Sequence, residues 1–259
     1  MTDPNLNDPI LKVRGLNKHF GGVVATEDLD FEVERGEIHA VIGPNGAGKT
    51  TFVAQIAGMI IPDSGSIIFD GDEIGGLSAH ARSQCGLARS FQITSIFKNF
   101  PVIENVAMSI QAHDGHSFHF WRRANTDPAL NDPARKLLDS VGLGARAETL
   151  ASNLAHGEQR QLEIAMALAT GPKLLLLDEP TAGMGPEDSQ RMVSFLRDIK
   201  GEYSMLLIEH DMDTVFALAD RVTVLIYGST IATGTPEEIR QNDEVRAAYL
   251  GEDDEVKYA

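Results

Sequence analysis

GPNGAGKT, the stretch from Gly43 to Thr50, stands between a continuous apolar run at 38–42 and a helical pattern at 49–57. A glycine, four residues, Gly-Lys and Ser or Thr make the spacing of a loop whose backbone N–H groups surround phosphates. A strand before the loop and a helix after it are the context this pattern requires, which disfavours a Gly-rich surface turn. The residues expected to contact the nucleotide here are Gly43, Pro44, Asn45, Gly46, Ala47, Gly48, Lys49, Thr50 and Thr51.

The same alternation of buried strand and helix returns later in the chain. Short apolar runs occupy 174–177, 205–208 and 222–227, and helical patterns begin at Pro186 and Met212. Strands that are apolar throughout are typical of a parallel sheet covered by helices on both faces. Residues 29–33 instead alternate apolar and acidic side chains, which predicts a half-buried strand in an antiparallel N-terminal part.

Strand signals are missing from the middle of the chain, where helical patterns cover 102–112, 133–141 and 158–169. We expect Asp132-Pro133 to begin one of these helices and Thr235 to Glu238 to form a capping box before a C-terminal helix. The sequence thus predicts one α/β domain over 8–259. Its core spans 8–100 and 170–235, its helical subdomain spans 101–169, and its C-terminal helical extension spans 236–259.

A pair of carboxylates follows the buried run LLLL at 174–177. Ligands of open α/β sheets bind at the carboxyl ends of the strands. We expect Asp178 to hold Mg²⁺ there and Glu179 to act on the water that attacks the γ-phosphate. A solvated acidic turn is the better interpretation of such a pair alone, but the phosphate loop favours the functional one.

Composition limits the classes of partner. The 22 basic and 38 acidic side chains give a formal charge of −16, which disfavours binding to nucleic acid. No run approaches the roughly 20 apolar residues of a membrane-spanning helix. The first ten residues lack a signal-peptide pattern and Cys85 is the single cysteine, so we expect a cytosolic protein.

GPNGAGKT, LLLLDEP and LAHGEQRQLEIAMALA together resemble the ATPase domains of ABC transporters over nearly the whole chain. The resemblance implies an ABC-type P-loop fold that binds ATP and Mg²⁺. It implies that Phe20 stacks on adenine, that Gln92 senses the metal and the attacking water, and that His210 contacts the γ-phosphate and steadies Glu179. It also implies Thr50, Gln92 and Asp178 as metal ligands. Taken singly, Phe20 could be a core aromatic, Gln92 a loop residue and His210 a helix cap.

The family's signature motif, which caps the ATP held by a second subunit, corresponds to residues 154–158. The usual form is Leu-Ser-Gly-Gly-Gln, whereas here Leu154 precedes Ala155, His156, Gly157 and Glu158. The hydroxyl that would bond the γ-phosphate is missing, so we expect a weaker clamp built from backbone donors. The segment 182–185, AGMG, also lacks the carboxylate that is common in this loop.

LAHGEQR, PTAGMGPED and the ending VRAAYLGED resemble ATP-binding subunits of importers for branched-chain and other hydrophobic amino acids. Urea or amide importers, a lipopolysaccharide exporter and soluble ABC ATPases are the competing families. The resemblance implies a second ATPase subunit, either a distinct homologue or a second copy, two membrane permeases, and an external substrate-binding protein. It implies a peripheral position on the cytoplasmic face of the inner membrane. Permeases are expected to dock near 92–102, where Phe97 and Phe100 are candidate contacts. The segment 116–123 is either a segment at the membrane interface or a loop packed against its own domain.

Overall fold

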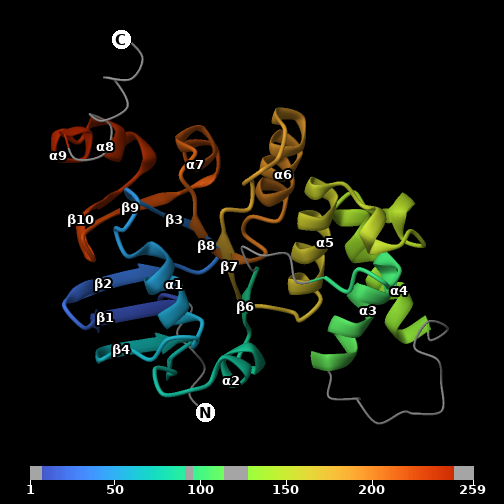
Figure 1. The fold of residues 1–259 in the computed structure, drawn as a ribbon, viewed down its shortest axis with the longest axis horizontal. Helices are drawn as coiled ribbons and strands as arrows, with labels where there is room; N and C mark the ends of the chain where they lie inside the picture. The colour runs from blue at the N-terminus through green and yellow to red at the C-terminus, as the bar shows by residue number, and fades with distance from the viewer. Residues whose placement is uncertain (1–7, 91–95, 114–127, 248–259) are drawn as a thin grey trace.

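Two β-sheets pack against each other in this computed structural model, which describes residues 8–90, 96–113 and 128–247 (Figure 1). The first sheet is antiparallel, in the order β2-β1-β4-β5. Its strands are β1 (Leu11–Phe20), β2 (Val23–Val33), β4 (Ser64–Phe69) and β5 (Asp72–Glu73). The N-terminal antiparallel part expected from the alternation at 29–33 is confirmed.

The second sheet has the order β10-β9-β3-β8-β7-β6, and all its strand pairs are parallel except β9 with β10. Its strands are β3 (Ile38–Ile42), β6 (Leu87–Arg89), β7 (Leu174–Asp178), β8 (Ser204–Ile208), β9 (Arg221–Ile226) and β10 (Ser229–Gly234). The order is not sequential, because helices cross over between the parallel strands. The expectation of a mostly parallel core sheet is therefore confirmed.

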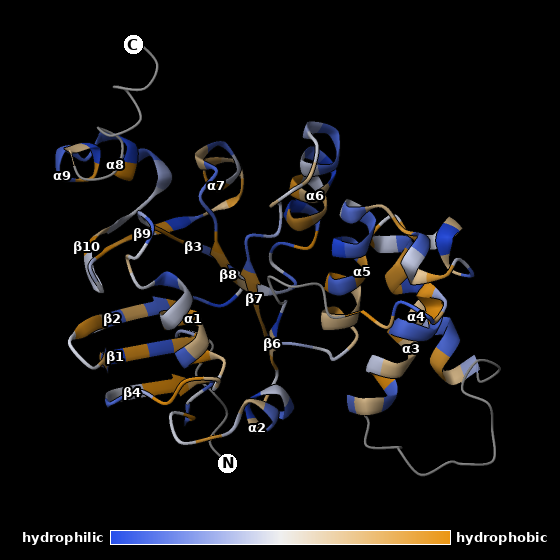
Figure 2. Cartoon of the chain, viewed as in Figure 1, coloured by the Kyte–Doolittle hydropathy of each residue, from blue (hydrophilic) through white to orange (hydrophobic). Residues whose placement is uncertain are grey.

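Strand β7 shows why its sequence is apolar without interruption. Leu174 and Leu176 join a hydrophobic cluster with the antiparallel sheet, while Leu175 and Leu177 join a second cluster with the helices on the other face. Successive side chains of a strand point to opposite faces, so a strand covered on both sides must be apolar at every position. Figure 2 shows these central strands in the hydrophobic colour.

The helices divide between the two faces of the parallel sheet. Helix α1 (Lys49–Ile56) buries its apolar side in the cluster shared with the antiparallel sheet. Helices α6 (Pro186–Asp198) and α7 (Met212–Leu218) pack on the opposite face. Short helices α2 (Ala79–Gln84), α8 (Pro236–Gln241) and α9 (Asp243–Val245) lie farther from the centre.

Three helices form a separate group at the end of the molecule next to β6 (Figure 1). They are α3 (Val102–His113), α4 (Pro128–Ser140) and α5 (His156–Leu168). Helix α4 does not begin at Asp132-Pro133 as expected, since Pro133 lies inside it. The described part of this helix already includes Pro128, so Asp132-Pro133 does not mark its start.

Two other helix starts show how their first turns are capped. Thr235 Oγ1 accepts from the Glu238 N–H and the Glu238 carboxylate accepts from the Thr235 N–H, which confirms the expected capping box of α8. Helix α5 begins two residues earlier than predicted, at His156. Among the described residues, no helix is both long enough and apolar enough to cross a membrane.

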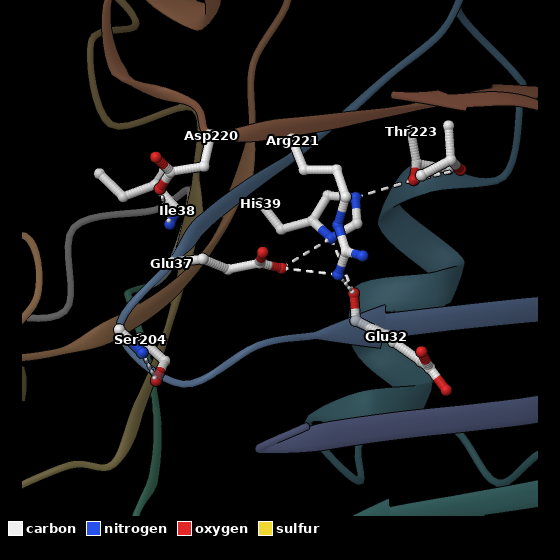
Figure 3. A network of polar contacts seen from close by, with 10 residues as sticks. Glu32, Glu37, Ile38, His39, Ser204, Asp220, Arg221 and Thr223 are labelled. Carbon is white, nitrogen blue, oxygen red and sulfur yellow. Dashed lines mark hydrogen bonds and ion pairs between the residues drawn. The ribbon is translucent and has the colours of Figure 1, made fainter. Parts of the chain in front are cut away.

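A buried polar network joins the two sheets (Figure 3). His39 Nδ1 donates to the Glu32 carbonyl over 2.7 Å, and its Nε2 lies 2.8 Å from Thr223 Oγ1. Arg221 from β9 bonds the same carbonyl and also pairs with Glu37 at 2.9 Å. Burial lowers the pKa of His39 below its usual 6.5, which fits a neutral ring that donates on one side and accepts on the other.

Candidate nucleotide-binding site

The phosphate loop connects the end of β3 to α1 and takes its shape from close backbone contacts. A Cβ at Gly43 would lie 2.1 Å from the Leu225 carbonyl oxygen, and one at Gly48 would lie 2.1 Å from that of Ala25. Both glycines also have positive φ, at 153° and 99°. Only glycine fits such positions, so β2 on one side and β9 on the other fix the loop.

The turn between β9 and β10 adds a third contact to the loop. The Gly228 N–H donates to the Ala47 carbonyl over 2.9 Å, and the Gly228 carbonyl accepts from Glu27 of β2. At the outer end of the loop, Asn45 and Gly46 are exposed. The inner residues are thus held while the tip is open to a ligand.

Lys49 folds back over the loop that precedes it. Its Nζ donates to the carbonyls of Gly43 at 2.5 Å and Pro44 at 3.0 Å. Burial lowers the pKa of Lys49, while the nearby charges of Glu179 and Asp178 act in the opposite direction. The lysine and the acid pair therefore share one electrostatic environment, as a site for a phosphate with a cation requires.

Asp178 ends β7 at the level of the phosphate loop. It stands opposite Ile208 of β8, and Ile208 in turn stands opposite Val41, two residues before the loop. Its carboxylate is almost buried and forms an ion pair with Arg89 at 2.8 Å. A buried carboxylate at this level and the exposed Thr50 in the first turn of α1 are oxygen donors of the kind Mg²⁺ prefers, so these residues fit the ion.

Glu179 has a left-handed backbone, with φ of 48°. Its N–H donates to the Ile208 carbonyl over 2.9 Å, and its Oε1 lies 3.6 Å from His210 Nδ1. The conformation is rare outside glycine and clusters at functional sites. It turns the side chain away from the strand and toward His210, which is largely exposed.

Glu209, which the sequence patterns did not single out, is buried beside His210. Its Oε1 accepts from both the N–H and the hydroxyl of Thr181, and its Oε2 accepts from the His210 N–H. Glu209 thus links the loop after Glu179 to His210. Glu209 directly follows an apolar strand. The same position drew attention to Asp178, so this signal could have identified Glu209 from the sequence.

Phe20 ends β1 at the hairpin that faces the loop. It pairs with Val23 of β2. Two residues further along β2, the carbonyl of Ala25 contacts Gly48 of the phosphate loop. The ring is 49% exposed, and Lys18 Nζ lies 5.4 Å from its centre. A side chain this exposed is not a core residue, and part of its ring surface is available for stacking.

His210 lies two residues before α7 but does not cap this helix. Asp211 is the N-cap instead, because its side chain accepts from the Asp213 N–H. Thr51, the last residue expected to contact the nucleotide, is half-buried in the first turn of α1. Gln92 and the segment 116–123 lie outside the described residues.

The signature residues form the N-terminal end of α5. Ala155 is the N-cap, with extended backbone at φ −62° and ψ 161° and no side-chain acceptor. The Glu158 carboxylate accepts from the Ala155 N–H at 2.9 Å and also binds Arg146. His156 is exposed and Gly157 is buried. Figure 1 shows α5 and α1 separated by strands of the parallel sheet, so the signature residues and the phosphate loop belong to different parts of the surface.

Comparison with known proteins gives two family matches and several similar proteins. The family model for the ABC transporter matches residues 26–182, and one for the branched-chain amino acid ATP-binding cassette transporter matches 229–255. The high-affinity branched-chain amino acid transport ATP-binding protein BraF of Pseudomonas aeruginosa is 38% identical over 95% of this chain and 100% of its own. LivG of Escherichia coli, of the same description, is 39% identical with the same coverage.

Solved structures show the same architecture. A nucleotide-free ATP-binding cassette from an ABC transporter is 26% identical, covers 93% of this chain and 98% of its own, and has a TM-score of 0.82. The ADP conformation of the ATP-binding cassette MJ1267 is 27% identical, covers 94% of this chain and 99% of its own, and has a TM-score of 0.83. The fold, the phosphate loop and the family match agree, and the chain belongs to the ABC transporter family of ATPases.

Proposed function

We propose that this chain hydrolyses ATP as one of two ATPase subunits that power an importer for branched-chain or related hydrophobic amino acids. The observation that carries the substrate class is the match of residues 229–255 to the branched-chain amino acid cassette family. BraF and LivG, which are similar over 95% of the chain, are named for that transport. The ATPase activity itself follows from the family and the cassette fold.

The proposed chemistry uses the groups that the sheet brings to one edge. Backbone N–H groups of the loop and Lys49 hold the β- and γ-phosphates. Thr50, Asp178 and Gln92 would hold Mg²⁺, which supplies neutralisation of the charge on the phosphate oxygens. Glu179 accepts the proton of the attacking water, and His210 keeps its carboxylate aimed at that water.

The proposed site is completed by a second ATPase subunit. Residues 155–158 lie at the start of α5, apart from the phosphate loop of the same chain. A helix N-terminus offers unpaired N–H groups to an anion, which suits the γ-phosphate of an ATP bound on another subunit. We infer that each ATP is held between two subunits.

A groove between the core and the helical group is the proposed docking place for a permease. A pocket of about 260 Å³ lies between α2 and β6 on one side and α5 on the other, with Met59 and Met166 in its lining. Phe97 and Phe100, just beyond the segment 91–95, are 50% and 44% exposed. An apolar pocket and exposed aromatic side chains both suit a partner segment with an apolar face. Binding there would hold the helical subdomain, proposed as 101–169, at the membrane surface.

One relative favours a second candidate. The lipopolysaccharide export system ATP-binding protein LptB of Escherichia coli is 36% identical over 94% of this chain. An exporter subunit is therefore one competing function, and a urea importer or a soluble ATPase remain the others. The chain's −16 charge also disfavours a nucleic-acid partner.

Copurification and reconstitution test this proposal. A tagged chain is recovered from native membranes, its partners are identified, and the complex is placed in lipid with its binding protein. We expect two permeases to copurify. We also expect the binding protein with leucine to stimulate ATP hydrolysis more than the binding protein with urea does. Recovery with lipopolysaccharide-export components, or with no membrane protein, would reject importer function. As a control on the nucleotide site, Lys49→Ala is expected to weaken MgATP binding about 10-fold or more.

A further inference from the structure

Arg160 joins the signature helix to the two catalytic-site acids of the same chain. It lies one turn into α5 and is almost buried. One amino group of its guanidinium donates to the carbonyl oxygens of Asp178 and Glu179, the latter at 3.3 Å. The other bonds Glu163 at 2.6 Å. Charged donors bond carbonyls more strongly than neutral ones, so this is a firm connection.

The acceptors of these bonds belong to a strained segment. Glu179 has φ of 48°, a left-handed backbone conformation that a residue with a side chain rarely adopts. Its N–H is tied to Ile208 of β8, and its carbonyl is tied to Arg160. The peptide groups on both sides of the Glu179 Cα are therefore held, and that determines where its carboxylate points.

Two further contacts bring the tip of α5 to the loop after Glu179. A Cβ at Gly183 would lie 3.2 Å from His156 Nε2, so the ring rests against this glycine. A Cβ at Gly157 would lie 3.2–3.3 Å from Asp188 at the start of α6. His156 thus touches the loop that Arg160 holds at its beginning, and Gly157 lies against the helix that follows this loop.

We propose that Arg160 is a positioning residue that couples the two ATP sites of the assembled pair. The inference rests on the proposed function, in which α5 clamps the ATP of the other subunit while Glu179 acts on the ATP of its own. When the other subunit's ATP contacts the signature residues, it changes or fixes the position of α5. Arg160 transmits this to the carbonyls of Asp178 and Glu179 and so brings the Glu179 carboxylate into its catalytic orientation. Hydrolysis at one site then depends on occupancy of the other.

The test compares Arg160→Lys and Arg160→Gln with the parent in the reconstituted complex. Lysine keeps the charge but cannot reach Glu163 and two carbonyls together from one rigid plane. Arg197→Gln is the matched control, because Arg197 also donates to a carbonyl, that of Ala217, but on the exposed side of α6. We measure MgATP affinity of the full chain, then kcat, KM and the Hill coefficient of the complex.

We expect both Arg160 variants to lower kcat about 10-fold or more, with KM and MgATP affinity within about threefold of the parent. The Hill coefficient for ATP should fall toward 1. Arg197→Gln should keep all these values. A purely structural role would lower the folded fraction but leave kcat per nucleotide-binding site and the Hill coefficient unchanged, and this result would overturn the proposal.

Glu163→Gln keeps the experiment decisive if the Arg160 variants do not fold. It leaves the carbonyl bonds of Arg160 but loosens the guanidinium, so we expect a smaller fall in the Hill coefficient at parental MgATP affinity. An unchanged Hill coefficient in Glu163→Gln would then reject the coupling. Failure of the proposed function looks different, because the parent complex itself would lack substrate-stimulated hydrolysis.

Discussion

Arg89 donates a hydrogen bond to Asp178 Oδ2 over 2.8 Å, and the two side chains are only 11% and 4% exposed. The acid assigned to Mg²⁺ is therefore already neutralised by an arginine from the strand that leads to Gln92. Mg²⁺ and Arg89 are both positively charged and would both bind this carboxylate. We infer that they compete for it.

This competition predicts two opposite effects of Arg89→Gln. Without nucleotide, the variant leaves a buried carboxylate without its counter-charge, and the free energy of unfolding should fall by about 1–3 kcal/mol. With ATP present, the Mg²⁺ concentration for half-maximal binding should decrease. Urea unfolding and Mg²⁺ titration of ATP binding measure the two effects. Arg191→Gln, which removes an exposed pair with Asp188, is the control. Equal Mg²⁺ requirements in parent and variant would argue against the competition.

Glu179→Gln should separate binding from hydrolysis. The amide occupies the same space but cannot take a proton from water, so kcat should fall at least about 100-fold while MgATP affinity stays within about threefold. Steady-state hydrolysis and equilibrium binding are the measurements. Glu187→Gln, at an exposed glutamate of α6, should change neither. Near-normal turnover by Glu179→Gln would place the catalytic base elsewhere.

Ala155→Ser should act on the helix and on the clamp. The backbone of Ala155 already has the extended geometry of an N-cap, so a serine hydroxyl can accept an N–H of the first turn and stabilise the isolated chain by about 0.5–1.5 kcal/mol. In the reconstituted complex we expect the same hydroxyl to face the γ-phosphate of the ATP on the second subunit, so basal hydrolysis without transport substrate should rise.

Ala155→Gly serves as the control, since glycine improves on alanine at an N-cap without adding a hydroxyl. Thermal unfolding and basal ATPase rates are compared among the three proteins. If serine and glycine raised the basal rate equally, helix capping and not a phosphate contact would explain the effect.

The pH dependence of stability should report His39. Because burial lowers its pKa below 6.5, the unfolded chain binds more protons than the folded chain between the two pKa values. The free energy of unfolding should therefore be largest above about pH 6.5 and should fall as the pH decreases through this window. Urea unfolding between pH 5 and 8 measures the slope. His39→Gln should flatten it, whereas His80→Gln, at an exposed position, should not. Parallel curves for all three proteins would mean that other groups cause the dependence.

Sequence predicted the parts of this molecule that local rules control. The loop at 43–50 and the acid pair at 178–179 could be placed because strand, loop and helix follow one another in the chain. The predicted start of α4 was wrong because two Asp-Pro pairs, ending at 128 and 133, carry the same helix-start signal. Arg89, Arg160 and Glu209 were missed because their roles depend on partners 18 to 89 residues away in the chain. Such pairings arise only when the strands assemble, and a local pattern marks at most one of the two partners, as the apolar strand before Glu209 does.

The phosphate loop lies early in the chain, but its shape depends on segments made much later. Leu225 blocks any side chain at Gly43, and Gly228 donates to Ala47. During synthesis, residues 43–50 leave the ribosome long before these two contacts exist. The order of translation therefore delays the finished nucleotide pocket until β9 and the turn after it have joined the sheet. A chain that stops before residue 221 would carry the whole GPNGAGKT sequence and still lack the walls that give it its form.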